Sequence, residues 1–441
     1  MPHIVSAAAY TPRRVILVYL TTNGLFTLAA SLIWAINTIF LIQEGGLSLF
    51  QVMLVNTVFL IAQMVFEVPT GVIADTIGRK ASYLLSIGTI IVSTLLYVIT
   101  PILGWGIGGF ILASVLIGLG FTFQTGAVDA WVVDALDASG WDAPKERVFA
   151  WGQMATGMAM IGGSLLGGFL GQANLYAPYV VRASVLVVAF FTVLVLVRDS
   201  GFTPRPLHFS NFGAETKSVM AVGVRYGWGS AVVRPLMFVS LVTGVVFMFS
   251  FYSWQPYVLE LLGRPDAVWL LGLVQAGSSL AMIGGNLLVR VVMREGARRR
   301  APASVLAVGS VAAAVAVAAI GAVGLLGMRT GLLPAALAIG LWVSWSVIFG
   351  LLGPVRSGFI NEHIPSAQRA TVLSLDSLFA DAGGTLGQPA LGWIATRFSI
   401  GLAWLLGAVF FAGAAPLYLR AGRAARGEEG MQPGVPKSVD G

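Results

Sequence analysis

The chain has 441 residues, of which 57% are hydrophobic and only 10% are charged. A soluble domain carries charge on about a quarter of its residues, so this composition excludes a soluble enzyme, a secreted disulfide scaffold and a nucleic-acid-binding protein. The sequence has no cysteine, which also rules out a thiolate nucleophile and a cysteine-ligated metal. We therefore predict an all-α polytopic membrane protein and expect no cofactor and no metal site.

Apolar stretches long enough to cross a bilayer, about 20 residues each, form two sets of six around a polar connection over roughly 198–234. They cover residues 15–42, 48–73, 81–100, 107–136, 148–171 and 176–197, and then 235–260, 267–293, 302–327, 332–354, 371–396 and 399–419. We predict an N-terminal half over 1–200, a cytoplasmic central linker over 201–234, a C-terminal half over 235–420 and a cytoplasmic tail over 421–441. Within the linker, residues 211–230 are weakly amphipathic and could lie on the membrane surface or be a plain connection.

The basic residues mark one side of the membrane. With the N-terminus placed inside, the arm, loops and tail on that side hold all 26 lysines and arginines but four. The four exceptions are Arg182, Arg264, Arg329 and Arg397. By the positive-inside rule, this asymmetry predicts a multi-pass protein of the cell inner membrane with both termini in the cytoplasm. The net charge of +7 then reflects topology and contact with the anionic lipid bilayer, and we expect no nucleic-acid partner.

Landmarks recur between the two halves at a nearly constant offset. The segment GGSLLG over 162–167 is echoed by GGTLG over 383–387, at an offset of 221, and Gly71 is echoed by Gly285, at an offset of 214. We infer two halves related by duplication. This arrangement is typical of secondary transporters that rock about a site near the middle of the membrane.

One motif closes the second predicted span, where residues 66–80 read FEVPTGVIADTIGRK. We expect Gly71 to let a neighbouring helix approach closely, Asp75 to pair with basic groups and Gly78 to permit a tight turn. Arg79 and Lys80 would anchor the loop at lipid headgroups. A charge cluster of this kind can stabilise one state of a two-state protein.

The motif resembles the G-x-x-x-D-x-x-G-R-K loop between the second and third helices of the major facilitator superfamily. It matches at Gly71, Asp75, Gly78, Arg79 and Lys80, and the preceding E-x-P-T-G is similar to that of exporter-like members. The resemblance implies twelve helices in two six-helix halves and a secondary transporter rather than an enzyme. The antiporter motif G-P-x-x-G-G of that superfamily is matched only in part, because Ser164 stands in place of the proline.

Charged groups inside membrane spans are costly, so each is a functional candidate. Asp381 lies near the middle of the eleventh span, Asp129 in the inner half of the fourth and Glu67 near the end of the second. No predicted span contains a histidine, so these carboxylates are our candidates for proton coupling. The competing interpretations are helix packing for Asp381 and bracing of the loop for Glu67. We expect Asp376 to be interfacial and Arg182 to snorkel outward.

The resemblance also implies a central cavity lined mainly by the first, fourth, seventh and tenth spans. Candidate lining residues in those spans are Asn23, Trp34, Asn37, Gln124, Trp254, Gln255 and Trp345. Sparse amides and indoles in an apolar wall suit an amphipathic organic molecule better than a sugar or an organic phosphate. For each aromatic residue, helix packing or contact with lipid is the competing interpretation.

Together these features predict a monomeric exporter of an amphipathic small molecule, working by alternating access and coupled to protons. An uptake symporter or facilitator on the same fold stays open, since the motifs do not separate the two. Asp129, Asp134 and Asp137 superficially resemble the aspartate cluster of a membrane prenyltransferase, but their spacing disfavours that enzyme. A sensor that transports nothing is the remaining alternative.

Overall fold

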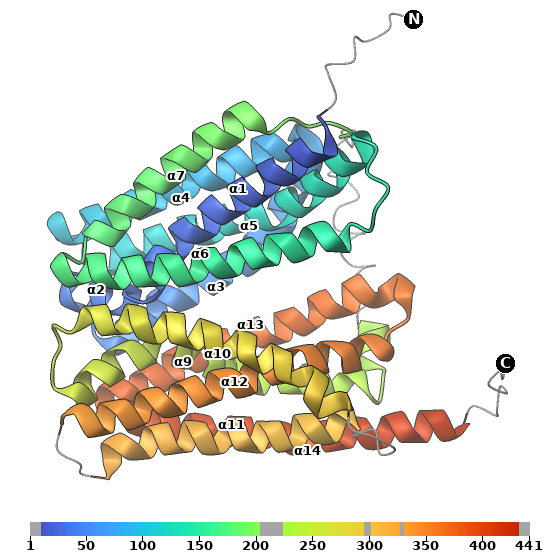
Figure 1. The fold of residues 1–441 in the computed structure, drawn as a ribbon. Coiled ribbons are helices and arrows are strands. Elements are labelled where there is room, and N and C mark those ends of the chain that lie inside the picture. Colours follow the sequence, from blue (N-terminus) through green and yellow to red (C-terminus); the bar gives the residue numbers. More distant parts are fainter. Residues whose placement is uncertain (1–9, 203–223, 295–300, 327–329, 432–441) are drawn as a thin grey trace, which may run out of the picture.

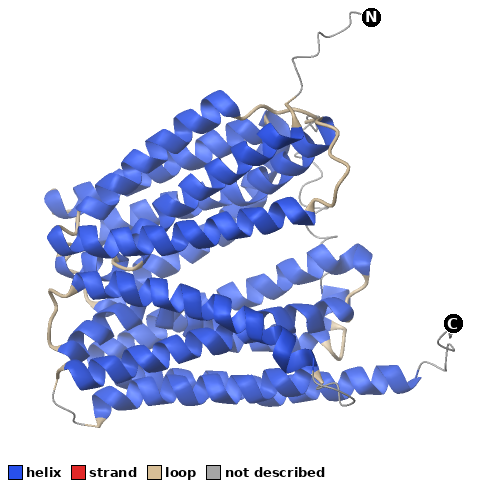
Figure 2. Ribbon diagram, in the orientation of Figure 1, coloured by secondary structure: helices blue, strands red, loops and turns tan. Residues whose placement is uncertain are grey.

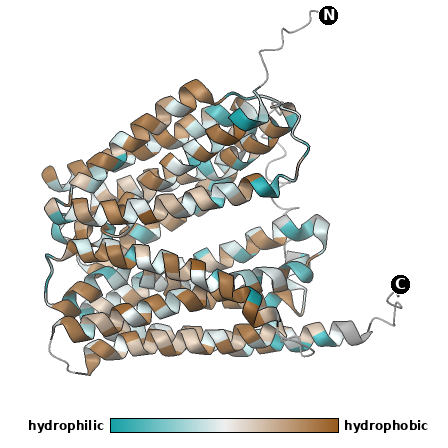
Figure 3. Cartoon of the chain, in the orientation of Figure 1, coloured by the Kyte–Doolittle hydropathy of each residue, from teal (hydrophilic) through white to brown (hydrophobic). Residues whose placement is uncertain are grey.

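The computed structural model describes residues 10–202, 224–294, 301–326 and 330–431. Over these ranges the chain is helical and contains no strand (Figure 2). The helices form two bundles, drawn in blue to green and in yellow to red in Figure 1. Hydrophobic residues dominate the middle of the helices, and hydrophilic ones gather toward their ends (Figure 3).

The N-terminal bundle contains α1 (Pro12–Trp34), α2 (Asn37–Gln43), α3 (Leu49–Ile77), α4 (Arg79–Ile102), α5 (Gly106–Ala138), α6 (Glu146–Ala173) and α7 (Ala177–Leu196). The C-terminal bundle contains α9 (Val233–Leu262), α10 (Val268–Arg294), α11 (Pro302–Leu325), α12 (Leu332–Glu362), α13 (Arg369–Arg397) and α14 (Ile400–Met431). Since α1 and α2 together make the first predicted span, each bundle supplies six spans.

Eleven of the described helices are long and apolar enough to cross a membrane. The predicted span that does not meet this criterion is α13, whose polar residues include Asp376, Asp381 and Gln388. It nevertheless packs along α9 and α3 like the other spans. The all-helical prediction is confirmed, and the low hydropathy of α13 reflects polar groups that face protein.

Two predicted helix ends are too early. The helix α12 continues to Glu362 through Pro354, where we expected the span to stop. The helix α14 runs to Met431, although we expected the last span to end at residue 419. Ala421 and Ala425 remain buried in the C-terminal bundle, and alanine favours helix strongly, so the helix persists beyond the apolar stretch.

The central linker is largely outside the described residues, as is most of the amphipathic stretch over 211–230. Residues Val224–Trp228 form one helical turn that packs on α9 and α13. The division of the chain at residues 200 and 235 stays a prediction.

The helices pair in the same way in both bundles. Helix α1 packs against α6 and α7, as α9 packs against α13 and α14. A Cβ atom on Gly167 would overlap the carbonyl oxygen of Leu32 in α1, and one on Gly387 would overlap that of Val245 in α9. These glycines hold equivalent places at an offset of 220 residues, one fewer than the sequence suggested. The repeat therefore preserves a contact in which only glycine lets two backbones approach.

The two bundles are joined at the end of the molecule opposite the chain termini (Figure 1). Five hydrogen bonds link described residues across the bundles, and all of them lie in that half of the molecule: Thr38–Gln255, Gln255–Trp34, Gln43–Pro265, Phe50–Thr396 and Trp269–Gln172. At the end that holds the termini, no hydrogen bond or ion pair between described residues connects the bundles. Among the described residues, the polar contacts between the bundles are therefore confined to the joined end.

Candidate functional site

Three adjoining cavities lie in the middle of the molecule, and Trp34 lines all of them. One of about 320 Å³ lies between the bundles, a second of about 320 Å³ belongs to the N-terminal bundle, and a third of about 260 Å³ lies mainly against the C-terminal bundle. We call the three together the central cavity. Trp34 is the last residue of α1, at the break before α2, which places its indole where the three spaces meet.

The wall formed by the N-terminal bundle is polar. Asn23, Gln124 and Asp129 line it, and the Asn23 Nδ2 donates a hydrogen bond to Thr156 Oγ1 at 2.9 Å. The Asp129 side chain is exposed on this wall, close to the Tyr19 ring. A carboxylate and amides that face an open space can bind the polar part of an organic molecule.

The wall formed by the C-terminal bundle is aromatic. The rings of Trp342 and Trp345 stack at 4.8 Å between centroids, and Phe247 and Phe349 stack at the same distance. The Nε1 atoms of both tryptophans are buried without a hydrogen-bond partner. Such a wall offers a large apolar contact area with few fixed polar demands.

The part of the cavity nearest the joined end is built by α2, α4 and α7. The Tyr179 hydroxyl donates to Asn37 Oδ1 at 2.8 Å, and the Tyr179 ring stacks on Tyr97 at 5.8 Å. Arg182, one turn after Tyr179, lines the cavity and is 2% exposed. Arg182 therefore does not snorkel toward a headgroup as we expected, because the side chain turns inward between α4 and α7.

Six of the predicted site residues line the central cavity: Asn23, Trp34, Asn37, Gln124, Asp129 and Trp345. They come from α1, α2, α5 and α12. The structure thus brings together residues that are more than 300 positions apart in the sequence.

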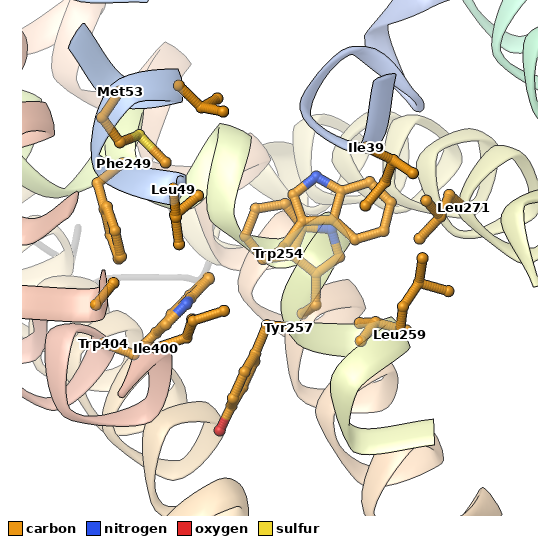
Figure 4. Packing of buried hydrophobic residues seen from close by; sticks show 14 of the residues in the cluster. Ile39, Leu49, Met53, Phe249, Trp254, Tyr257, Leu259, Leu271, Ile400 and Trp404 are labelled. Atoms are coloured by element: carbon orange, nitrogen blue, oxygen red, sulfur yellow. The ribbon is translucent and has the colours of Figure 1, made fainter. Parts of the chain in front are cut away.

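Trp254 and Gln255 were expected on the cavity, but the described cavities do not include them. Trp254 is 2% exposed and lies in the buried cluster among Ile39, Leu259 and Leu271 (Figure 4). It follows Phe247 by two turns of α9, toward the joined end, where α2 packs over α9 and leaves no open space. A tryptophan is a suitable residue for a cavity wall, but Trp254 lies too far along α9 toward the joined end to reach the cavity.

Gln255 holds the first span together across the bundle interface. Its Nε2 donates to the carbonyl oxygen of Trp34 at 2.8 Å, and its Oε1 accepts from the Thr38 backbone N–H at 3.2 Å. These are backbone groups freed by the break between α1 and α2, which would otherwise be buried without partners. Gln255 thus connects the two bundles by hydrogen bonds and is not part of the cavity wall.

The remaining proton-coupling candidates lie on α3 and α13, two helices that pack on each other across the bundle interface. Glu67 on α3 and Asp381 on α13 are close enough for their charges to repel each other, and α3 packs on α13. Neither residue lines the described cavities. Asp376, expected at the membrane interface, is instead buried, and its Oδ1 accepts hydrogen bonds from Arg356 Nη2 at 2.7 Å and Ser240 Oγ at 2.8 Å.

The loop motif forms a charge network within the N-terminal bundle. Arg79 Nη1 lies 2.7 Å from Asp75 Oδ1, and Arg79 Nε lies 4.0 Å from Asp134 Oδ2. Lys80 donates from its backbone N–H to Asp199 Oδ1 at 2.9 Å. Burial raises the pKa of the Asp199 carboxyl, while this hydrogen bond and the nearby basic charges oppose the rise. The network ties the loop after α3 to the end of α7.

Two glycines of the motif behave differently. Gly78 has φ of 105°, a conformation that glycine adopts without strain, and a Cβ there would overlap the Asp199 carboxylate. Gly71, expected to allow close helix approach, has nothing within 4 Å of a Cβ built on it. The expected close contact is therefore absent among the residues that the structure describes.

Arg182, Tyr97 and Gln63 line the cavity and were not among the predicted site residues. They lie on α7, α4 and α3, outside the four spans to which the prediction was confined. A signal for Arg182 was present, since it is the sole charged residue of α7 over Ala177–Leu196.

The family model of the Major Facilitator Superfamily matches residues 19–351 of this chain. This range covers most of both bundles. The chain belongs to the major facilitator superfamily. The twelve-span prediction and the assignment as a transport protein rather than an enzyme are therefore confirmed.

Two relatives cover most of the chain. The chain is 22% identical over 385 residues to a tetracycline resistance protein, class G, of Vibrio anguillarum. The matched region covers 82% of this chain and 86% of that protein. The chain is also 23% identical over 374 residues to the uncharacterized MFS-type transporter YxaM of Bacillus subtilis (strain 168), covering 82% and 84%.

Solved structures share the fold at low sequence identity. A mutant of the nucleoside transporter NupG superposes with a TM-score of 0.73 at 12% identity, covering 92% of this chain and 99% of that one. A POT family transporter in complex with 5-aminolevulinic acid superposes with a TM-score of 0.72 at 15% identity, covering 92% and 95%. These similarities establish the major facilitator fold.

Proposed function

We propose that this membrane transporter exports an amphipathic small organic molecule by alternating access, coupled to protons. The observation that carries the proposal is the central cavity, where a polar wall from one bundle faces an aromatic wall from the other. A molecule with a polar group and an apolar ring system can satisfy both walls at once. An organic phosphate would leave the tryptophan and phenylalanine surfaces without an apolar partner.

Alternating access is supported by the way in which the bundles are fastened. To open the joined end, the molecule would break five hydrogen bonds and the close contact between Gly168 and Gly272. Each hydrogen bond contributes about 1 kcal/mol, so substrate binding can supply energy of this size. Gly71 would then meet the opposite bundle at the other end, as its place in the motif leads us to expect.

The export direction draws on charge and on relatives. We place both termini on the cytoplasmic side of the inner membrane. The end that holds the termini, where no polar contact between described residues connects the bundles, then faces the cytoplasm and admits substrate from there. The relative named as a tetracycline resistance protein favours export. We propose that a monomer is sufficient, because one chain supplies both walls of the cavity.

Proton coupling is assigned to the carboxylates that face open space or each other. Asp129 lies on the polar wall, where a bound substrate would compete with a proton for the carboxylate. Glu67 and Asp381 repel each other while both are ionised, so protonation of one would favour closer packing of α3 and α13. Each site links a protonation to substrate binding or to the movement of the bundles.

The test is substrate flux in proteoliposomes under an imposed pH gradient, with a panel of amphipathic compounds that includes tetracycline. The proposal predicts that substrate and protons move in opposite directions, and that Asp129→Asn reduces proton-driven flux by more than about tenfold. The matched control is Asp137→Asn on the same helix, which removes only an exposed partner of Lys145. Movement of substrate and protons in the same direction would favour the uptake alternative, and no flux of any compound would refute both.

A further inference from the structure

Arg182 is a buried charged residue within a membrane span. It is 2% exposed, its Nε has no hydrogen-bond partner, and no ion pair joins it to a residue that the structure describes. A guanidinium carries five N–H donors and stays ionised. Burying such a charge unpaired costs several kcal/mol, so proteins retain one where it binds something.

The polar groups beside Arg182 are already engaged elsewhere. The Tyr179 hydroxyl donates to Asn37 Oδ1, and the Tyr97 hydroxyl is hydrogen-bonded to Ser114 Oγ at 2.9 Å. The two rings stack at an interplanar angle of 17° near the guanidinium. No hydrogen bond joins the guanidinium to either hydroxyl, so its donors lack an acceptor among these neighbours.

The acceptor can enter from the cavity. Arg182 and Asn37 both line the space between the bundles, and Oδ1 of Asn37 is engaged, which leaves its amide N–H groups as donors. Apolar surface is adjacent, because Trp34, Phe247 and Phe251 line the same space. The carboxylate of Asp129 lines the neighbouring compartment and forms no ion pair with Arg182.

We propose that Arg182 binds an anionic group of the substrate, a carboxylate or an ionised acidic hydroxyl attached to an aromatic ring system. A carboxylate matches the fork of the guanidinium and can accept two hydrogen bonds from it. Asn37 donates a further hydrogen bond, and the ring lies against Trp34 and Phe247. This inference rests on the proposed transport function and specifies the substrate class.

The test compares 2-naphthoate with its neutral analogue 2-naphthamide, by isothermal titration calorimetry on the purified full-length protein. A hydrogen bond to a charged group contributes about 1.5–3 kcal/mol, so the carboxylate should bind about 10- to 100-fold more tightly than the amide. Arg182→Met should abolish this preference and change the affinity for 2-naphthamide by less than about threefold.

A stability readout separates a binding role from a structural one. Removing an unpaired buried charge should raise the melting temperature of the empty protein in Arg182→Met. The matched control is Arg356→Met, which should lower it, since that change leaves Asp376 without its buried partner. If Arg182→Met does not fold, Arg182→Lys and Arg182→Gln decide: the lysine variant should keep a preference for the carboxylate, and the glutamine variant should lose it.

The inference is overturned if the unaltered protein binds both compounds equally, or if Arg182→Met loses both and also melts earlier. Flux assays distinguish this failure from failure of the transport proposal. A protein that exports neutral or cationic compounds but shows no carboxylate preference keeps its function and loses this site. A protein that prefers the carboxylate and moves no compound keeps the site and loses the function.

Discussion

The two bundles share one architecture but differ in where they place charge. The N-terminal bundle turns Asp129 and Arg182 toward the central cavity and arranges Asp75, Arg79 and Asp134 in an accessible network at its end. The C-terminal bundle buries its charge in the pair of Arg356 and Asp376 and presents stacked rings to the cavity. The two bundles thus share their helix packing, while one contributes a polar wall to the cavity and the other an aromatic wall.

The largest expected effect contrasts the two charge clusters. Asp376→Ala leaves Arg356 buried without its carboxylate, so we expect a loss of about 3–5 kcal/mol of stability. Asp75→Ala removes a carboxylate whose side chain is 38% exposed, so we expect a loss of at most about 1 kcal/mol. Denaturant-induced unfolding of the purified variants measures both losses. Equal losses would show that the two clusters do not differ as described.

A middle-sized effect tests what the bundles have in common. Gly167→Ala and Gly387→Ala each place a methyl group against a backbone carbonyl of the neighbouring helix, so each should cost about 1–3 kcal/mol. Gly71→Ala is the matched control, because open space surrounds that position and alanine favours helix. Thermal melting of the three variants should show two losses of similar size and no loss in the control. A marked difference between the first two would contradict the equivalence of these contacts.

The smallest expected effect concerns the aromatic wall. Trp345→Leu keeps an apolar side chain but removes an indole that lines the cavity, and the contact of a substrate ring with such an indole is worth about 0.5–1.5 kcal/mol. We expect the affinity for amphipathic substrates to fall about 2- to 10-fold without regard to their charge. Binding titrations with charged and neutral compounds test this prediction. A loss of affinity confined to one charge type would show that the aromatic wall recognises charge, which contradicts the division between the two walls.

The sequence predicted the helices well because lipid imposes a simple rule on them. The predicted ends of the apolar stretches lie close to the helix ends, except in α12 and α14. There, polar and alanine-rich turns extend the helix because they pack against neighbouring helices. The break at Trp34 was not predicted, since its stability depends on Gln255, which is 221 positions away. Such a distant partner leaves no local signal.

The candidate site was predicted in part for a similar reason. Residue type identified Asn23, Asn37 and Asp129 as suitable for a cavity, and all three line it. Depth could not be read from periodicity, so Trp254 was assigned to the cavity although it lies beyond its closed end. Arg182 was misjudged because the direction of a long side chain depends on the helices packed around it.

The most direct test of alternating access is a pair of distances measured between spin labels. The chain contains no cysteine, so labelling sites can be introduced as cysteine pairs without first replacing a native cysteine. One pair at Ala138 and Glu362 reports on the end that holds the termini, and one pair at Trp105 and Arg264 reports on the joined end; all four residues are exposed. On addition of a transported compound, the account predicts that the first distance shortens while the second lengthens. If both distances stay unchanged during active flux, or both change in the same direction, alternating access by rocking of the two bundles is contradicted.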